Sequence, residues 1–279
     1  MSSDLQQTFA EHGFVVLPGF RDAAQIASIR QRAGELVDAY DMAGEQAVFS
    51  TQEQQRRVND YFLGSAETIR CFLEEEALDA NGRLKHDKAL SINKIGHAMH
   101  DLDPVFDRFS HGADLDSVAR AVGLVRPLLW QSMYIFKQPQ IGGEVRWHQD
   151  ASFFVTTPVS VTTFWFALED AHRGNGCLWV QPGGHRSPLR EHFVRTGNAA
   201  AIETLDTTPW PSLHQALPLE MAAGTLVVFH GLLPHYSGPN RSATSRHAYT
   251  LHATDGRAAY APHNWLQRRK DFPVRGFVD

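Results

Sequence analysis

Residues 159–169 read VSVTTFWFALE, a short run of β-branched and aromatic side chains that is typical of a strand. Segments of the same kind follow and precede it: LLWQSMYIFK (128–137), CLWVQ (177–181), GTLVVFH (224–230) and RHAYTLHA (246–253). Turn-forming residues separate them, at Pro139, Gly142-Gly143, Asn175-Gly176, Pro182-Gly183-Gly184 and 237–240. Several short strands punctuated in this way predict an antiparallel sandwich or barrel.

The first 125 residues are predicted to be largely helical. In RDAAQIASIRQRAGELVDAY (21–40), apolar residues recur three or four apart, and Asp22 with Gln25 resembles a capping box. Two more helices are expected, over SAETIRCFLEEE (65–76) and over DLDSVARAVG (114–123). We therefore expect one domain over residues 1–279 that is mainly β with flanking helices, in which residues 1–125 pack on a β core formed by residues 126–279.

Composition excludes several classes of protein. The net charge is −5 and Lys and Arg are scattered along the chain, so the sequence lacks the basic cluster that is typical of nucleic-acid-binding proteins. No apolar stretch approaches the roughly 20 residues of a membrane helix, and the N-terminus lacks the pattern of a secretory signal. Cys71 and Cys177 cannot build a disulfide framework, which suits a reducing compartment. We expect a cytoplasmic protein without a membrane or nucleic-acid partner; its oligomeric state is not predicted.

A metal site is predicted around EVRWHQDASFF (144–154), which places His148 two residues before Asp150. Residues two apart on a strand point to the same face, so both side chains can bind one ion. His235, in FHGLLPHYSGPN (229–240), is the expected third ligand, and His230 is the alternative. Two imidazoles and one carboxylate leave coordination positions open, as in iron(II) enzymes that use O2, whereas a structural zinc site is closed by four protein ligands.

Arg246 is the candidate for binding a second carboxylate. It follows His235 by eleven residues, across a loop that contains Gly238 and Pro239, so a hairpin would return it to the metal. A guanidinium grips a carboxylate through two hydrogen bonds. Such a carboxylate exists on 2-oxoglutarate, whose keto-acid end can chelate iron. Ser237 is expected to add one hydrogen bond, and Arg241 is the alternative arginine.

The sequence resembles the phytanoyl-CoA dioxygenase family of iron(II)- and 2-oxoglutarate-dependent oxygenases, in particular its branch of the phytanoyl-CoA dioxygenase domain-containing protein 1 type. The motifs that carry the resemblance are FAEHGFVVLPGF (9–20), SINKIGHAMHDLDPVF (91–106), QSMYIFKQPQIGGEV (131–145), WHQDASFF (147–154), NGCLWVQPGGH (175–185), HGLLPHYSGPNRSATSR (230–246), AYTLH (248–252) and HNWLQ (263–267). Together they span nearly the whole chain.

The resemblance implies a double-stranded β-helix, or jelly-roll, core with iron(II) at one open end. It assigns the metal to His148, Asp150 and His235, and the distal carboxylate of 2-oxoglutarate to Arg246 and Ser237. It also implies three residues that line the cosubstrate, which spacing alone does not single out: Lys94, Met133 and Trp165.

The expected activity is hydroxylation of an unactivated C–H bond in an unidentified small molecule, with O2 and 2-oxoglutarate converted to succinate and CO2. Five residues near the motifs are expected to form the substrate pocket: Gln131, Tyr134, Phe153, Phe154 and Trp179. No basic cluster lies near the motif, so an acyl-CoA substrate is not implied. A metal-dependent cupin-type isomerase or hydrolase and a non-catalytic 2-oxoglutarate-binding protein are the alternatives.

Overall fold

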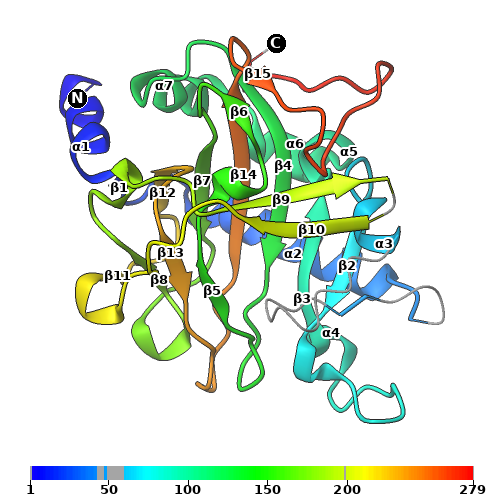
Figure 1. The fold of residues 1–279 in the computed structure, drawn as a ribbon. Helices are drawn as coiled ribbons and strands as arrows, with labels where there is room; N and C mark the ends of the chain where they lie inside the picture. Colours follow the sequence, from blue (N-terminus) through cyan, green and yellow to red (C-terminus); the bar gives the residue numbers. More distant parts are fainter. Residues whose placement is uncertain (1, 43–46, 49–59, 198, 279) are drawn as a thin grey trace.

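Two antiparallel sheets form the core of the computed structural model, which describes residues 2–42, 47–48, 60–197 and 199–278 (Figure 1). The seven-stranded main sheet has the order β1 (Phe14–Leu17), β12 (Leu226–His230), β7 (Thr162–Ala167), β14 (Ala248–Asp255), β4 (Pro127–Ile135), β3 (Ile92–His97) and β2 (Ile69–Leu73). The second sheet has the order β11 (Leu217–Leu219), β8 (Leu178–Val180), β13 (His235–Ser237) and β5 (Val145–His148). The predicted mainly β, jelly-roll architecture is confirmed.

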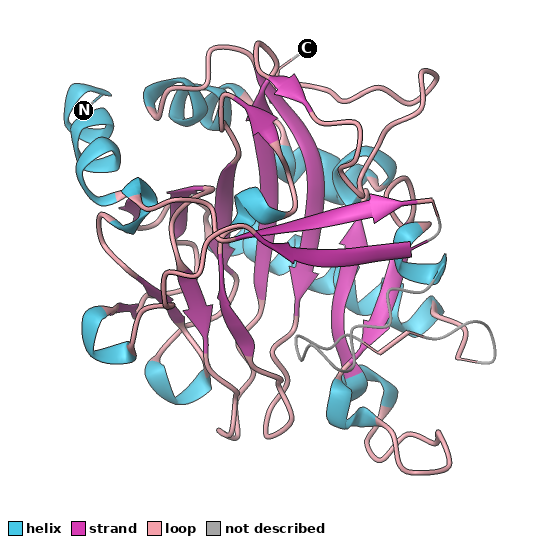
Figure 2. Ribbon diagram, in the orientation of Figure 1, coloured by secondary structure: helices cyan, strands magenta, loops and turns pink. Residues whose placement is uncertain are grey.

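Helices cover the outer face of the main sheet, with α2, α5 and α6 behind it in Figures 1 and 2. The helices are α1 (Ser2–His12), α2 (Ala23–Ala39), α3 (Asp60–Leu63), α4 (Lys88–Ser91), α5 (Met99–Leu102), α6 (Pro104–Ser110) and α7 (Ala113–Ala121). Two small pairs complete the fold: β9 (Glu191–Thr196) with β10 (Ala199–Thr204), and β6 (Thr156–Thr157) with β15 (Ala259–Tyr260). No helix in the described part of the chain has the length and apolar character needed to cross a membrane.

Strand alternation divides the interior of the protein into two layers. On β7, Phe164 and Phe166 pack in the apolar cluster that includes the helices, whereas Trp165 and Ala167 pack in the cluster between the two sheets. The same alternation holds on β12, where Val228 faces the helices. Successive residues of a strand point to opposite faces of the sheet. Alternate side chains of one apolar strand therefore pack against the helices, and the others line the space between the sheets.

The helices predicted over residues 21–40 and 114–123 are confirmed. α2 begins at the capping box of Asp22 and Gln25, and its residues Ile26, Ile29 and Ala33 are buried against the main sheet. α7 ends before Gly123, whose φ of 106° is a conformation that favours glycine. In both helices, the apolar residues that the sequence spacing places on one face are the residues that pack on the sheet.

The helix predicted over residues 65–76 is wrong. The chain forms β2 over Ile69–Leu73 and then a short 3-10 turn over Glu75–Ala77. Cys71 and Leu73 face the helical layer while Phe72 faces the opposite side, which is strand alternation. An apolar run this short fits either structure, and pairing with β3, where Cys71 lies opposite Ile95, selects the strand.

Three strands of the predicted helical part also extend the main sheet, which the sequence analysis missed. β2 and β3 continue it beyond β4, and β1 pairs with β12 at the opposite edge. Residues 1–125 thereby contribute directly to the walls of the space between the sheets.

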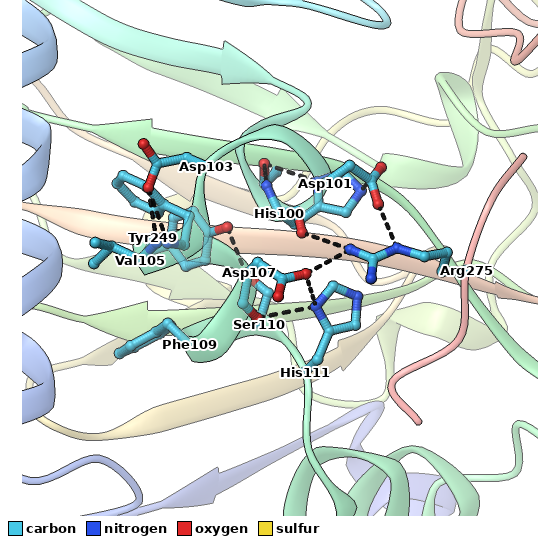
Figure 3. A network of polar contacts seen from close by, with 12 residues as sticks. His100, Asp101, Asp103, Val105, Asp107, Phe109, Ser110, His111, Tyr249 and Arg275 are labelled. Carbon is cyan, nitrogen blue, oxygen red and sulfur yellow. Dashed lines mark hydrogen bonds and ion pairs between the residues drawn. The ribbon is translucent and has the colours of Figure 1, made fainter. Parts of the chain in front are cut away.

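A buried polar network holds the C-terminal segment against α5 and α6 (Figure 3). Asp101 lies 3.0 Å from His100 Nε2, 3.1 Å from Arg268 Nη2 and 3.0 Å from Arg275 Nε. Arg275 also donates to Asp107 at 2.6 Å. Burial opposes ionisation, but these neighbours, led by His100, outweigh it and lower the pKa of Asp101 to about 2.

Replacing Asp101 by Asn should destabilise the fold strongly, because it leaves the buried guanidinium of Arg268 without its counter-charge. Removing one partner of a buried ion pair costs about 3–5 kcal/mol. We expect a loss of this size in the free energy of unfolding, measured by urea denaturation at neutral pH. A loss below about 1 kcal/mol would show that the network is dispensable.

The matched control is Asp271→Asn, since Asp271 is 76% exposed and lies 3.6 Å from Arg269. Its change should stay below about 1 kcal/mol. The pKa of Asp101 is lowered on folding, so its contribution is fully present above pH 3.8 and is lost as the pH falls toward 2. The difference in stability between wild type and Asp101→Asn should shrink over that interval.

Candidate metal centre and cosubstrate cavity

His148, Asp150 and His235 converge at one end of the space between the sheets. His148 ends β5 and pairs across the sheet with His235, the first residue of β13. Asp150 starts a 3-10 turn, and the intervening Gln149 is extended, with φ −124° and ψ 131°, which keeps Asp150 on the side of His148. One potential ligand atom from each of the three residues lies within 4.8 Å of the others.

Backbone carbonyl groups orient both imidazoles. Nδ1 of His148 lies 2.8 Å from the carbonyl oxygen of Arg146, and Nδ1 of His235 lies 3.0 Å from that of Leu233. A carbonyl only accepts, so each Nδ1 carries the proton and each Nε2 presents a lone pair. These Nε2 atoms lie 3.6 and 3.7 Å from Oδ1 of Asp150.

In the neutral imidazoles, three electron-pair donors therefore face one another. The arrangement is repulsive unless a cation, either a metal ion or a proton, lies among the atoms, and their spacing needs only small side-chain movements to place all three on one metal ion. Both nitrogen donors have the oriented partner that metal-binding imidazoles ordinarily have. The set fits a divalent metal with open coordination positions, the geometry of iron(II) oxygenases.

The other carboxylate oxygen of Asp150 faces away from this point. Oδ2 accepts a hydrogen bond from the hydroxyl of Thr163 and lies 3.6 Å from Nε2 of His252. Burial alone would raise the pKa of Asp150, but in the absence of a metal ion the positive charge of protonated imidazoles around it, led by His235, holds that pKa far below its usual range. Asp150 is thus a carboxylate whenever the protein is folded near neutral pH.

Arg246 and Ser237 lie together in the same cavity. Arg246 Nε donates to the carbonyl of Gly176 at 3.2 Å, and Nη2 donates to Ser237 Oγ at 3.3 Å. Nη1 is buried and has no hydrogen-bond partner within the described residues. Burial lowers the pKa of Arg246 to about 10, so the side chain stays charged at neutral pH. An orphaned donor on a buried cation indicates a site for an anion.

The residues that the family resemblance added also line this cavity. Lys94 on β3, Met133 on β4 and Trp165 on β7 all face the space between the sheets. Lys94 Nζ lies 4.0 Å from the sulfur of Met133, and the guanidinium of Arg246 lies 5.3 Å from the ring centroid of Trp165. Burial lowers the pKa of Lys94 to about 7.

A second buried charge cluster supports the loop that leads into β5. Glu74 accepts hydrogen bonds from Asn93 at 2.9 Å and from the backbone N–H of Gly143 at 3.1 Å. Lys137 donates to the carbonyls of Gly143 and Ser237. Burial raises the pKa of Glu74 and lowers that of Lys137. The two groups hold Gly143 from both sides and so fix the approach of the chain to His148.

Three of the five predicted substrate residues line the cavity: Gln131, Phe153 and Phe154. Tyr134 and Trp179, also predicted, lie outside the cavity. Tyr134 follows Met133 on β4 and so points to the opposite face, into the helical layer. Trp179 lies between the inward residues Leu178 and Val180 of β8, and the guanidinium of Arg173 lies over its ring. Strand alternation decides both cases.

The alternative ligands lie outside the site. His230 contacts Phe9 and His185, and its Nδ1 accepts from the backbone of Leu232. Arg241 is exposed and pairs with Glu76 at 2.8 Å. The geometry therefore favours His235 over His230 and Arg246 over Arg241.

The sequence analysis missed two residues that contact Asp150, Thr163 and His252. Strand alternation could have identified both. Thr163 is two residues before the inward-facing Trp165 on β7, and His252 is four residues after the inward-facing Ala248 on β14. It also missed part of the cavity wall, formed by Phe62, Phe193 and Trp265. These three come from α3, β9 and the C-terminal segment, and no spacing rule connects them.

The comparisons of this chain with known proteins identify the family to which it is similar. The sequence profile of the phytanoyl-CoA dioxygenase family matches residues 9–248. Phytanoyl-CoA dioxygenase 1 of Oryza sativa subsp. japonica is 47% identical over 264 residues, which cover 94% of this chain and 92% of that protein. Phytanoyl-CoA dioxygenase domain-containing protein 1 of Bos taurus is 40% identical over 282 residues, which cover 98% and 97% of the two chains.

Solved structures share the fold at low sequence identity. EctD from S. alaskensis, solved with 2-oxoglutarate and 5-hydroxyectoine, superposes with a TM-score of 0.64 at 20% identity, covering 99% of this chain and 84% of that one. The epimerase SnoN, solved with Fe3+, alpha ketoglutarate and nogalamycin RO, has a TM-score of 0.66 at 17% identity and coverage of 99% and 93%.

A jelly-roll that carries a His–Asp–His donor set and a buried arginine in one cavity defines the class of iron(II)- and 2-oxoglutarate-dependent dioxygenases. Sequence similarity over nearly the whole length narrows the class further. The chain belongs to the phytanoyl-CoA dioxygenase family.

His235→Ala should abolish retention of a divalent metal, because it removes one of three converging donors. Even an outer residue that only orients a ligand is worth about 10–100-fold in affinity, so loss of a direct ligand should exceed that. Iron(II) or cobalt(II) affinity, measured anaerobically by calorimetry, checks this. His230→Ala is the control and should bind the metal like wild type; the reverse pattern would exchange the two assignments.

Proposed function

We propose that this protein hydroxylates an unactivated C–H bond of a small molecule and consumes 2-oxoglutarate and O2 in the reaction. We assign the iron to His148, Asp150 and His235. We assign the distal carboxylate of 2-oxoglutarate to Arg246 and Ser237. Lys94, Met133 and Trp165 line the space between these two ends. Residues 1–279 act as one oxygenase domain, because both the N-terminal part and the jelly-roll strands supply cavity residues.

When bound, iron(II) and 2-oxoglutarate supply the oxidation, in which O2 gives one atom to succinate and one to the substrate while CO2 leaves. The protein's own residues position and shield the reactants. The guanidinium of Arg246 and the hydroxyl of Ser237 hold one end of the cosubstrate. Lys94 and Trp165 are buried and Met133 is half-buried, so these side chains limit the access of water to the cosubstrate end of the site.

One observation carries the proposal: three facing electron-pair donors and a buried guanidinium with an unpaired N–H group share one cavity. The cluster of donor atoms requires a cation, and the guanidinium of Arg246 requires an anion. A 2-oxo dicarboxylate meets both demands, since its keto-acid end chelates the metal and its far end is a carboxylate. A cupin-type isomerase or hydrolase would use the first feature but would leave Arg246 without a ligand.

The substrate side of the cavity favours a small, largely apolar molecule. The ring centroids of Phe62 and Trp265 lie 4.6 Å apart, and those of Phe153 and Phe193 lie 5.5 Å apart. The ring of Phe153 reaches to within 6.3 Å of the His148 ring, so this aromatic wall extends to the metal centre. Gln131, on the floor of the cavity, is a polar handle that can orient a substrate.

Succinate release from 2-oxoglutarate tests the reaction class. Purified protein loaded anaerobically with iron(II) and then given O2 should form succinate, and chelation of the metal should stop it. A panel of small apolar metabolites, scored by increased succinate release, should identify molecules that accelerate the reaction. Protein that retains iron(II) but neither binds nor consumes 2-oxoglutarate would exclude the dioxygenase.

Arg246→Met should raise the concentration of 2-oxoglutarate required for half-maximal binding. A charge-assisted, two-pronged contact is worth about 1.5–3 kcal/mol, which corresponds to roughly ten- to a hundredfold. Anaerobic titration of the iron-loaded protein measures it. Arg241→Met, which removes an exposed arginine of the same loop, is the matched control and should bind 2-oxoglutarate like wild type.

We also assign the protein to a reducing, cytoplasmic setting. Cys71 and Cys177 are both buried and unpaired with each other, as cysteines in reduced compartments are. A reducing setting also favours retention of iron in its divalent state.

A further inference from the structure

The two oxygens of Asp150 have different surroundings, and we propose that His252 and Thr163 maintain this difference. Oδ1 faces the two metal-directed imidazoles, whereas Oδ2 faces Thr163 and His252. We infer that His252 is a positioning residue that keeps Asp150 a one-oxygen ligand. The inference rests on the proposed function and extends it to residues outside the metal and cosubstrate contacts.

The geometry around His252 leaves its ring one useful orientation. Its ring stacks on Phe154, with 5.0 Å between centroids and 17° between planes. Nε2 lies 3.6 Å from Oδ2 of Asp150, and Nδ1 is buried with no hydrogen-bond partner in the described residues. A lone pair on Nε2 would face a negative oxygen, so the N–H is on Nε2 and points toward Oδ2.

Thr163 approaches the same oxygen from the neighbouring strand. Thr163 on β7 lies directly opposite His252 on β14 in the sheet register, and its hydroxyl donates to Oδ2. Both side chains lie on strands of the main sheet, whereas Asp150 lies in the turn that follows β5 of the second sheet. The hydrogen bond from Thr163 and the nearby imidazole N–H of His252 both act on Oδ2, and together they oppose rotation of the carboxylate, which would bring both oxygens to the metal.

The orientation matters because coordination positions are few. Iron(II) held by three protein donors would keep positions open for 2-oxoglutarate and O2. If Asp150 bound the metal through both oxygens, one of these positions would be filled. By holding Oδ2 away from the metal, His252 and Thr163 would keep that position open for O2.

Anaerobic binding of iron(II) and then of nitric oxide, a surrogate for O2, tests this. Wild type loaded with iron(II) and 2-oxoglutarate should bind nitric oxide, detected by electron paramagnetic resonance. His252→Leu should bind iron(II) about 10–100-fold more weakly. At saturating iron(II) and 2-oxoglutarate it should also lose most of the nitric oxide signal. A purely structural role would leave that saturated signal intact.

Two variants serve as matched controls. His252→Gln keeps an N–H that can reach Oδ2, and it should recover the nitric oxide signal in large part. Thr162→Val alters the residue next to Thr163, whose hydroxyl donates to the carbonyl of Ser160 outside the cavity, and it should match wild type in both measurements. Thr163→Val removes the second donor at nearly constant shape, and its effect should have the same sign as that of His252→Leu even if the latter folds poorly.

The outcomes separate the inference from the proposed function. If wild type retains iron(II) and 2-oxoglutarate while His252→Leu and Thr163→Val match it in iron affinity and nitric oxide binding, the positioning role is wrong and the oxygenase stands. If wild type retains neither iron(II) nor 2-oxoglutarate, the proposed function fails and this inference fails with it.

Discussion

The site depends on one electrostatic constraint: two imidazole nitrogens and a carboxylate oxygen point at each other, and a cation must lie among them. Carbonyls of Arg146 and Leu233 hold one proton of each ring on the far side of His148 and His235. A proton on Nε2 or a metal ion relieves the repulsion, and the metal binds in place of the proton. Pairing of β5 with β13 holds the two imidazoles at the distance that one metal ion requires.

Strand alternation makes this arrangement compatible with a stable core. On each strand of the main sheet, one set of side chains closes the helical layer and the other faces the cavity. Phe164 and Leu251 stabilise the fold, while their neighbours Thr163 and His252 surround the carboxylate of Asp150. The polar floor of the site is therefore supported by an apolar layer directly behind it, which limits its movement.

The cavity buries several charges, and each has a distinct means of compensation. Glu74 and Lys137 are held through the backbone of Gly143, which fixes the loop entering β5. Asp150 is compensated by the hydroxyl of Thr163 and the imidazoles around it. Nη1 of Arg246 has no hydrogen-bond partner in the described residues, and this buried donor on a cation marks where an anion belongs. The unpaired donor of Arg246 therefore reflects a binding site for a ligand and not poor packing around the side chain.

The sequence by itself determined the fold class, the stripe of α2, and the convergence of His148 with Asp150, because these follow from local periodicity and from residues two apart. Only the tertiary structure decided between His230 and His235, placed Tyr134 in the outer layer and made residues 69–73 a strand. Each of these outcomes depends on register and on which face a neighbouring strand covers. Such information arises from contacts between distant segments, and a short apolar run does not contain it.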